Sequence, residues 1–561
     1  MDVPVALGVG AAFAASVWAT LIAAGEVYFD SVTMFVFFLL SGRYLEMMAR
    51  QKAARSVETL ARAIPAFATR LAAWPGSSEG QHVAVAELRV GDAVQIKPGE
   101  TVPADGFVLD GMSATDESLL TGESRPLPKA AGDALIGGSV NTASPLVMRV
   151  ERVGAATRVA AIQRLMERAA AEKPRLVEMA DRVAGRFIVA LLVLAVATAL
   201  GWWLIDPSRA LWVFVAVLVV SCPCALSLAT PAALTVATGA LAARGVLVTR
   251  GHAIEALARA DRFIFDKTGT LTLGRMVLVE VMPVRDDAAR ALALAAALER
   301  GSEHPIARAL AGGEDGAIAV NGLRAVTGAG VEGEIDGRVW RLGRAEFVAS
   351  LHGTALPADL QQKLGAGDTA IALGNAEGWQ AFFLLSDALR PEAAAMAANL
   401  AEAGVRLSIF SGDALAAAAR VGAALGISDA RGGLSPEDKH AALKALQDAG
   451  ETVAMVGDGV NDAPVLAQAQ VSIAMGGGAD LARANADVVL LGNDLQALPE
   501  GLALARRTVR IVKQNLVWAF AYNFFAIPLA MAGWVTPWMA GIGMSASSLL
   551  VVLNALRLQR G

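Results

Sequence analysis

The sequence predicts a multidomain membrane protein in which two large polar insertions interrupt an α-helical transmembrane bundle. Hydrophobic residues make up 55% of the 561 residues and charged residues only 18%, a composition too apolar for a soluble enzyme of this size. The apolar residues gather in six blocks, each close to the ~20 residues that a helix needs to cross a bilayer. The blocks are approximately Val3–Ala24, Ser31–Met48, Gly185–Ile205, Ala210–Ala237, Asn515–Ala532 and Thr536–Leu556.

The basic residues predict how these six spans are oriented. Lysine and arginine flank the two insertions, whereas the short loops on the other side contain almost none. The positive-inside rule therefore places both insertions and both termini in the cytoplasm, with a bacterial inner membrane as the expected location. The net charge of -5 gives no indication of nucleic acid binding. The flanking residues are Arg50, Lys52, Arg55, Arg182, Arg186, Arg244, Arg250, Arg506, Arg507, Arg510 and Lys513.

The first insertion, Lys52–Lys173, predicts a small β domain. His82–Val85 and Ala93–Ile96 have the pattern of short strands, and a Gly-Asp turn separates them. A polar tetrapeptide, Thr121–Ser124, lies between apolar runs and contains a carboxylate, Glu123.

The second insertion, Gly245–Arg510, predicts an α/β domain with a ligand site at one end of a parallel sheet. Three apolar runs with the pattern of buried strands each continue into a polar loop. Because the carboxyl ends of parallel strands lie at one edge of a sheet, we expect the three loops to form one site. The loops are Asp266-Lys267-Thr268-Gly269-Thr270-Leu271-Thr272, Ser411-Gly412-Asp413 and Gly457-Asp458-Gly459-Val460-Asn461-Asp462.

The residues of these loops indicate phosphoryl transfer. Asp266 ends a strand and can attack a phosphoryl group as a carboxylate nucleophile, which divides one difficult step into two. Lys267 supplies fixed positive charge beside it. Lys439, between the second and third loops, is predicted to hold phosphate oxygens together with Ser411, and Asp458 is predicted to bind Mg²⁺.

The heptapeptide that begins at Asp266 resembles the phosphorylation loop of P-type ATPases, ion pumps that pass through an aspartyl-phosphate. The three loops together are similar to the haloacid-dehalogenase-like core of these pumps. Ser411 stands where that motif usually has threonine, which keeps the hydroxyl. The resemblance implies an ATP-hydrolysing enzyme that uses Mg²⁺.

The resemblance also implies roles for individual residues. Asp266, Thr268 and Asp458 are the implied Mg²⁺ ligands, and Asp462 joins them among the catalytic residues. The tetrapeptide around Glu123 matches the actuator-domain loop of the family, in which this glutamate positions the water that hydrolyses the aspartyl-phosphate.

A nucleotide-binding domain is implied between the first two loops. Glu299 and the run Ser302–Pro305 resemble the nucleotide-domain signature of the heavy-metal branch, in which a His-Pro pair, here beginning at His304, helps to hold the adenine. The family pattern also implies that Gly328 and Gly330 let the backbone approach ATP.

Two other nucleotide motifs are rejected. The stretch Gly328–Gly333 satisfies GxGxxG, but the segment after it alternates like a strand, whereas a dinucleotide site requires a helix there. No GxxxxGK[ST] sequence occurs, which argues against a Walker-type ATPase.

The fourth span contains Ser221-Cys222-Pro223-Cys224-Ala225-Leu226-Ser227. A proline inside a span frees backbone carbonyls and kinks the helix, which is tolerated where the break lines a protein cavity. Cys222 and Cys224 flank the break and can present thiolates to a soft cation. The segment resembles the metal-transport motif of heavy-metal P-type ATPases.

The last two spans indicate which metal is transported. Asn515 to Leu556 contains no Asp, Glu, Lys, Arg or His, whereas a divalent ion is expected to need charge compensation in the membrane. Two thiolates and a thioether suit Cu(I), with Ag(I) as a second soft cargo. The resemblance to the copper subgroup implies further residues: Tyr522, Asn523, Met544 and Ser548 for Cu(I) binding, and Glu46 and Asp181 for Cu(I) entry.

The resemblance implies a cytoplasmic copper chaperone as donor and an extracytoplasmic copper acceptor, besides membrane lipid. Copper pumps have eight spans and usually an amino-terminal metal-binding domain with Cys-x-x-Cys, whereas no Cys-x-x-Cys precedes Cys222 here. We therefore expect a shortened form of a longer pump that lacks this domain and the first two helices; a true six-span variant is the alternative. Ser227, where Gly is commoner, favours the type associated with cytochrome oxidase assembly.

The expected fold is thus a six-span α-helical bundle with a cytoplasmic β actuator domain, an α/β haloacid-dehalogenase-like phosphorylation domain and an α+β nucleotide-binding domain. The expected boundaries are 1–50 for spans one and two, 51–175 for the actuator domain, 176–240 for spans three and four, 241–275 and 387–510 for the phosphorylation domain, 276–386 for the nucleotide-binding domain and 511–561 for spans five and six.

The function expected from these features is ATP-driven export of Cu(I). Three alternatives are weighed against it. A divalent-metal pump for Zn, Cd or Co is disfavoured by the charge-free last spans, and a membrane-anchored phosphatase of the dehalogenase type by Cys222, Cys224 and Glu123. A non-catalytic copper receptor is disfavoured because the catalytic residues are all present.

Overall fold

The computed structural model divides into two compact units, Met1–Arg259 with Asp487–Gly561, and Ala260–Ala486. Each unit is described by itself. The residues that the structure describes are 3–22, 27, 29–30, 32–34, 36–37, 40–41, 44, 47–48, 64–72, 74–76, 80–117, 126–161, 163–164, 175–220, 224–285, 287–300, 302, 304–311, 318–326, 328–356, 369–458, 463–476 and 485–560.

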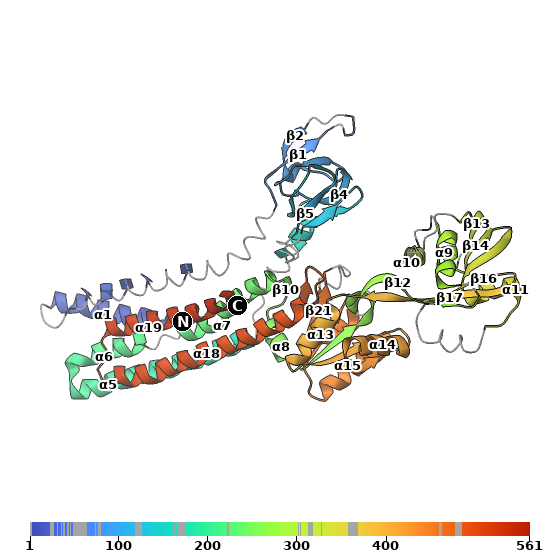
Figure 1. Cartoon of the computed structure of the whole chain (residues 1–561). Coiled ribbons are helices and arrows are strands. Elements are labelled where there is room, and N and C mark those ends of the chain that lie inside the picture. The colour runs from blue at the N-terminus through green and yellow to red at the C-terminus, as the bar shows by residue number, and fades with distance from the viewer. Residues whose placement is uncertain are drawn as a thin grey trace. The chain divides into compact units, whose positions relative to one another are not determined.

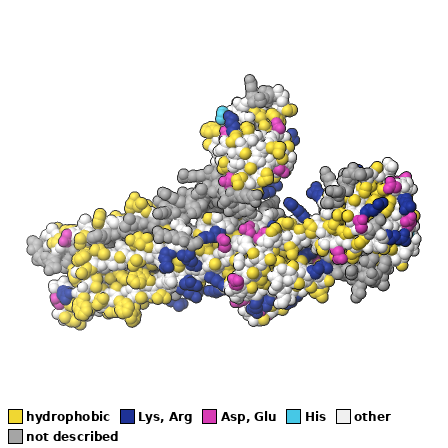
Figure 2. Space-filling model, viewed as in Figure 1, with side chains coloured by type: hydrophobic (Ala, Val, Ile, Leu, Met, Phe, Trp, Pro, Cys, Tyr) yellow, Lys and Arg dark blue, Asp and Glu magenta, His cyan; other side chains and the backbone are white. Residues whose placement is uncertain are grey.

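The first unit contains a bundle of long apolar helices (Figure 1). Its interior is filled by small and branched side chains, and Ala216, Val217 and Leu218 are fully buried in it. Large apolar side chains such as Leu204 and Phe524 are 87% and 74% exposed, and the surface over this bundle is mostly hydrophobic (Figure 2). Such a surface is what lipid, rather than water, solvates. The helices are α1 (Val3–Leu21), α5 (Arg175–Ile205), α6 (Pro207–Val220), α7 (Cys224–Ala242), α18 (Ala497–Met531) and α19 (Pro537–Leu556).

Two of the described helical segments are long and apolar enough to cross a membrane, Gly185–Ile205 and Pro537–Gln559. They coincide with the predicted third and sixth spans, but the predicted count of six is not confirmed. The second predicted span, Ser31–Met48, lies largely outside the described residues.

The fourth predicted span, Ala210–Ala237, coincides with parts of two described helices, α6 and α7. The structure has two helices there, since α6 ends at Val220 and α7 begins at Cys224. The kink predicted at Pro223 falls on residues 221–223, which lie outside the described residues, and stays a prediction.

The first unit also contains a β domain, as predicted. Its larger sheet has the order β2-β1-β3-β9-β4-β7, and a smaller one has the order β6-β5-β8. Alternating side chains such as Val94, Ile96, Leu146 and Met148 fill its core. The strands are β1 (Phe67–Leu71), β2 (Gly80–Ala84), β3 (Ala93–Ile96), β4 (Asp105–Asp110), β5 (Ser113–Asp116), β6 (Leu127–Lys129), β7 (Ala134–Leu135), β8 (Val140–Asn141) and β9 (Leu146–Arg152).

The second unit is built on a parallel sheet with the order β21-β20-β11-β18-β19. Its central strands are continuous apolar runs, as expected for strands covered on both faces. Phe263, Phe265 and Phe410 are fully buried. The elements are β11 (Arg262–Asp266), α13 (Ala393–Glu402), β18 (Arg406–Phe410), α14 (Leu415–Leu425), β19 (Asp429–Arg431), α15 (Pro436–Asp448), β20 (Val453–Gly457), α16 (Ala463–Gln468) and β21 (Val471–Met475).

An antiparallel sheet with the order β12-β17-β16-β15-β14-β13 forms the rest of this unit. Helices α9 and α10 and the sheet share a core that contains Leu298, Leu310 and Phe383. The elements are β12 (Thr272–Pro283), α9 (Ala288–Leu298), α10 (Pro305–Leu310), β13 (Asn321–Val326), β14 (Gly330–Ile335), β15 (Arg338–Gly343), α11 (Ala345–His352), β16 (Thr369–Asn375) and β17 (Gly378–Leu389).

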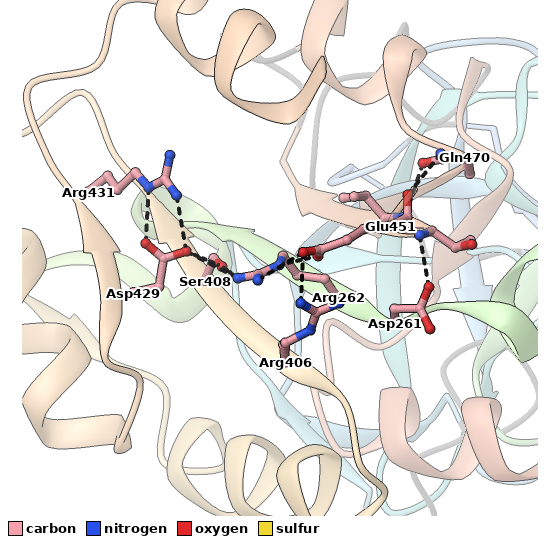
Figure 3. Close-up of polar contacts among 10 residues, drawn as sticks. Asp261, Arg262, Arg406, Ser408, Asp429, Arg431, Glu451 and Gln470 are labelled. Carbon is pink, nitrogen blue, oxygen red and sulfur yellow. Dashed lines mark hydrogen bonds and ion pairs between the residues drawn. The ribbon is translucent and has the colours of Figure 1, made fainter. Parts of the chain in front are cut away.

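A network of charges joins the amino ends of the parallel strands (Figure 3). Arg262, the first residue of β11, pairs with Glu451 at 2.6 Å and with Asp429 at 3.2 Å. Arg406 binds the other oxygen of Glu451 at 2.7 Å, and Arg431 binds Asp429 at 3.0 Å. Burial alone raises the pKa of Asp429, but hydrogen bonds from Arg431 and Ser408 and the charges of Arg431 and Arg262 outweigh it and lower that pKa. The network therefore ties four strands together in one register.

Replacing Arg262 by Leu should destabilise the parallel sheet by about 3 kcal/mol, because two carboxylates lose a mostly buried partner. Hydrogen exchange at the β20 amides measures the loss. Arg431→Leu is the matched control; its side chain is 42% exposed, so its loss should stay below about 1 kcal/mol. Equal protection of the β20 amides from hydrogen exchange in the two variants would contradict the conclusion that Arg262 stabilises the sheet more than Arg431 does.

Candidate functional site

The carboxylate of Asp266 lies at the carboxyl end of β11 and is buried, with the residue 7% exposed. Nζ of Lys439 lies 2.7 Å from its Oδ1, and Lys439 is 5% exposed. Lys439 comes from the first turn of α15, which begins with a capping box formed by Ser435 and Asp438. A capped helix end thus holds the cation beside the carboxylate.

The second predicted loop lies beside the first. Asp266 pairs in register with the last residue of β18, so Ser411 follows directly at the next strand tip. Ser411 is 1% exposed, and its hydroxyl accepts a hydrogen bond from the amide of Asp413 at 3.1 Å. The carboxylate of Asp413 forms an ion pair with Lys267. Two lysines, Lys267 and Lys439, therefore lie around the phosphorylation loop, each paired with a carboxylate.

The third predicted loop also reaches this position. Gly269 has φ +72, and a Cβ there would lie 2.7 Å from Oδ2 of Asp458. Glycine is therefore required, both for the left-handed backbone and for the close approach of the carboxylate. The structure brings together Asp266, Lys267, Gly269, Asp458 and the residues of the second loop.

The residues present fit Mg²⁺. Phe265 pairs with Val456 in parallel register, so Asp266 and Asp458 follow at neighbouring strand tips. Among the described residues no group of three or more His, Cys, Asp or Glu forms a metal cage. Mg²⁺ commonly takes one or two carboxylates and completes its shell with phosphate oxygens and water, so two carboxylates suffice. Thr268 lies in the same loop, with extended backbone at φ -76 and ψ 129.

Two residues that the sequence analysis missed, Asp387 and Arg390, hold the phosphorylation loop in place, one of them through Thr272. The hydroxyl of Thr272 donates to Oδ2 of Asp387 at 2.6 Å and accepts from the Gly269 amide at 3.2 Å. Arg390 donates to the carbonyl oxygen of Thr270 at 2.8 Å. Asp387 and Arg390 are distant in sequence and match no motif by themselves; the change from strand to helical pattern at this point was the available signal.

The predicted nucleotide residues lie around α9, α10 and β14. Glu299 caps the carboxyl end of α9, and His304 caps the amino end of α10 through Nδ1, which accepts from the Ile306 amide at 3.3 Å. Burial raises the pKa of the Glu299 carboxyl, and a hydrogen bond from Ser302 and the charge of His304 offset this only in part.

The two predicted glycines differ in their surroundings. Gly328 has φ +73 and no atom within 4 Å of a Cβ position, whereas a Cβ at Gly330 would collide with the backbone of Leu342. Gly330 is therefore required by the pairing of β14 with β15, whatever else it contacts. A strand, β14, follows these glycines, which confirms that no dinucleotide-binding helix is present there.

Several predicted residues cannot be placed. Cys224 begins α7 and Asp181 lies in α5, but their side chains are outside the described set. The predicted residues that lie wholly outside the described residues are Glu46, Glu123, Cys222 and Asp462.

The membrane residues of α18 and α19 do come together. A Cβ at Gly543 would lie 2.8 Å from the hydroxyl oxygen of Tyr522, so this tyrosine reaches the backbone of α19 one residue before Met544. Met544 is 4% exposed, and Asn523 and Ser548 are each 8% exposed. Oδ1 of Asn523 is buried without a hydrogen-bond partner among the described residues.

A buried carboxylate at the tip of a parallel sheet, flanked by lysines and a second carboxylate, defines a phosphotransfer enzyme of the haloacid dehalogenase class. Residues 260–470 match the family model of the haloacid dehalogenase-like hydrolases, and residues 64–167 match that of the P-type ATPase actuator domain. The relatives make the assignment more specific: the chain belongs to the P-type ATPases, which hydrolyse ATP through an aspartyl-phosphate.

Two curated relatives and one solved structure illustrate the similarity. Over its whole length the chain is 40% identical to the "Probable copper-exporting P-type ATPase V" of Mycobacterium tuberculosis, covering 73% of it. It is 36% identical to the "Probable copper-transporting ATPase PacS" of Synechococcus elongatus, covering 78% of it. The crystal structure of a zinc-transporting PIB-type ATPase in the E2.Pi state matches 99% of this chain and 94% of its own, with 31% identity and a TM-score of 0.64.

Asp266→Asn should abolish the acid-stable phosphoenzyme formed from γ-labelled ATP. The amide is nearly isosteric and can still accept from Lys439, but it is not nucleophilic. Asp448→Asn, at the exposed end of α15, is the control and should label normally. Label retained in Asp266→Asn would show that another residue is phosphorylated.

The raised pKa of Glu299 predicts a pH effect on ATP binding. If the carboxylate accepts a hydrogen bond from the nucleotide, the affinity for ATP falls as the pH falls through the raised pKa of Glu299, because the protonated carboxyl is a weaker acceptor than the carboxylate. The ratio of ATP dissociation constants for wild type and Glu299→Gln, measured at a series of falling pH values, should approach one as the pH passes below that pKa. A constant ratio would contradict a carboxylate contact.

Proposed function

We propose that the chain is an ATP-driven exporter of Cu(I). The observation that supports this cargo is the packing of α7, which begins at Cys224, against α18 and α19. The facing helices bury Met544, Asn523 and Ser548 and contain no ionisable residue from Asn515 to Leu556 apart from the phenol of Tyr522. The thioether of Met544 and the two cysteine thiolates are soft donors that suit a monovalent cation such as Cu(I), and the amide and hydroxyls supply further polar groups beside them.

The buried side-chain oxygen of Asn523 supports a cation site at this place. An amide oxygen without a partner among the described residues is costly in an apolar bundle unless something binds it. A transported cation provides such a partner. The segment from Asn515 to Leu556 offers no carboxylate or imidazole, the ionisable ligands that a divalent ion is expected to use in the membrane, which disfavours Zn(II), Cd(II) and Co(II).

The proposed phosphorylation step is carried by the residues at the tip of the parallel sheet. Asp266 attacks the γ-phosphorus of ATP, a carboxylate oxygen–phosphorus bond forms, and ADP leaves with the electrons of the broken bond. Lys439 and Lys267 offset the repulsion between the carboxylate and the phosphate oxygens, and the Ser411 hydroxyl donates to one of them. Mg²⁺, when bound by Asp266, Thr268 and Asp458, would neutralise phosphate charge. Asp462 is proposed to support the residues that would bind Mg²⁺.

The second half of the proposed cycle uses the actuator loop. Glu123 orients a water that attacks the phosphorus and releases phosphate, so Asp266 is regenerated. Glu299, His304, Gly328 and Gly330 are proposed to hold the nucleotide.

The remaining expectations complete the proposal. They are a bacterial inner-membrane location with cytoplasmic termini, six spans, the domain boundaries given above, entry of copper past Glu46 and Asp181, a cytoplasmic chaperone as donor, an extracytoplasmic acceptor, and Ag(I) as a second cargo.

The purified protein should hydrolyse ATP in response to Cu(I) and Ag(I), but not to Zn(II) or Co(II). Cys222→Ser and Cys224→Ser should each lower metal-stimulated turnover by about tenfold or more, since even outer-shell changes at metal sites have effects of this size. Thr235→Val is the control, because that exposed hydroxyl of α7 bonds the Pro231 carbonyl of its own helix. X-ray absorption should show copper bound mainly by sulfur; nitrogen and oxygen ligands would favour the divalent alternative.

A further inference from the structure

One side chain joins the three helices that surround the proposed cargo site. Asn515 of α18 is 2% exposed. Its Nδ2 donates to the carbonyl oxygen of Ala229 in α7 at 3.4 Å and to that of Val551 in α19 at 3.3 Å. Its Oδ1 accepts from Nδ2 of Asn554 in α19 at 2.9 Å. Every polar group of this buried amide thus has a partner on another helix.

The orientation of the amide follows from a chain of contacts that begins at a guanidinium. Arg557 can only donate, and its Nη1 donates to Oδ1 of Asn554 at 2.9 Å. Nδ2 of Asn554 must therefore face Asn515, which presents its Oδ1 in turn. The two Nδ2 hydrogens of Asn515 are left for the carbonyls of Ala229 and Val551.

The contacts of Asn515 lie one to two turns from the proposed cargo ligands in each helix. Cys224 precedes Ala229 by five residues, which is about 7.5 Å of helix. Ser548 precedes Val551 by three residues, or about 4.5 Å, and Asn523 follows Asn515 by eight residues, or about 12 Å.

The segment of α18 between Asn515 and Asn523 is packed against the same two helices. Nδ2 of Asn523 donates to the carbonyl oxygen of Ala519 at 2.8 Å, and Ala519 packs with Ala229 and Val551. Ala229 and Val551, whose carbonyl groups accept hydrogen bonds from Asn515, therefore contact Ala519, whose carbonyl group accepts from Asn523.

The proposed cargo ligands Cys224, Asn523 and Ser548 all lie on the same side of Asn515 along the length of the bundle. The strand that follows α7, β10 (Val246–Val248), pairs with β22 (Val488–Leu490), which precedes α18. The end of α7 and the start of α18 therefore lie together, and Arg507 of α18 donates to the carbonyl of Arg557 near the end of α19. In every helix, Asn515 or its partner therefore lies between this end of the bundle and the proposed ligand, as the order of the residues along α7, α18 and α19 requires.

We propose that Asn515 is a positioning residue for the cargo site: it fixes α7, α18 and α19 relative to one another, and so sets the spacing of the ligands that they carry. This inference rests on the proposed function. In an apolar bundle the hydrophobic effect does not hold helices in one register, whereas hydrogen bonds from an asparagine to two carbonyls do.

The test measures phosphorylation in two directions. Phosphoenzyme formed from ATP is titrated with Cu(I), and phosphoenzyme formed from inorganic phosphate is measured without copper. Asn515→Leu, similar in size but without polar atoms, should raise the Cu(I) concentration for half-maximal phosphorylation by about tenfold, while labelling from phosphate stays within about twofold of wild type. Asn554→Leu, which removes the donor to Oδ1, should shift half-saturation in the same direction by less.

Two controls separate positioning from general weakening of the bundle. Gln514→Leu removes an exposed acceptor of the same Asn554 amide, and Val512→Ala removes buried apolar volume from the same helix. Neither should shift the half-saturating Cu(I) concentration by more than about twofold, well under the shift expected for a residue that orients metal ligands.

The outcomes are distinct. Unchanged half-saturation in Asn515→Leu and Asn554→Leu, or a shift no larger than that of Val512→Ala, overturns the positioning role. Parallel loss of both labelling reactions also overturns it, because that pattern marks a general structural defect. A wild-type protein that Cu(I) does not stimulate overturns the proposed function, and this inference with it.

Discussion

The contact between Lys439 and Asp266 is the interaction on which the rest of the catalytic unit depends. A carboxylate that is 7% exposed would be expensive to ionise, and a lysine ammonium 2.7 Å away offsets that cost. The contact forms only if α15 and β11 are correctly placed, which requires the register of the parallel sheet. The charge network around Arg262, at the opposite end of the same strands, maintains that register.

The phosphorylation loop is also held from the antiparallel sheet of the same unit. Asp387 belongs to β17, and Arg390 follows that strand directly. Through Thr272 and the carbonyl of Thr270, both reach the loop that carries Asp266. A rotation of β17 relative to the parallel sheet would therefore move the loop backbone, which physically connects the antiparallel sheet to Asp266.

Much of this architecture could be predicted because its signals are local. Apolar runs that end in Asp266, Ser411 and Asp458 identify strands and their tips from a few residues each. The roles of Asp387 and Arg390 could not, because they depend on contacts with residues 115 and 120 positions away. The hydrogen bonds of Asn515 could not be predicted either, because a hydropathy pattern does not show which groups on other helices a buried amide will meet.

The burial of Asp266 has a consequence for energy storage. An acyl phosphate in free contact with water hydrolyses by itself, and the energy of ATP would then be lost as heat before any ion moved. A linkage formed at this shielded position has few water molecules to react with. The lifetime of this linkage then depends on how soon the protein admits and orients a water molecule. The protein, rather than the solvent, therefore sets the rate of this step.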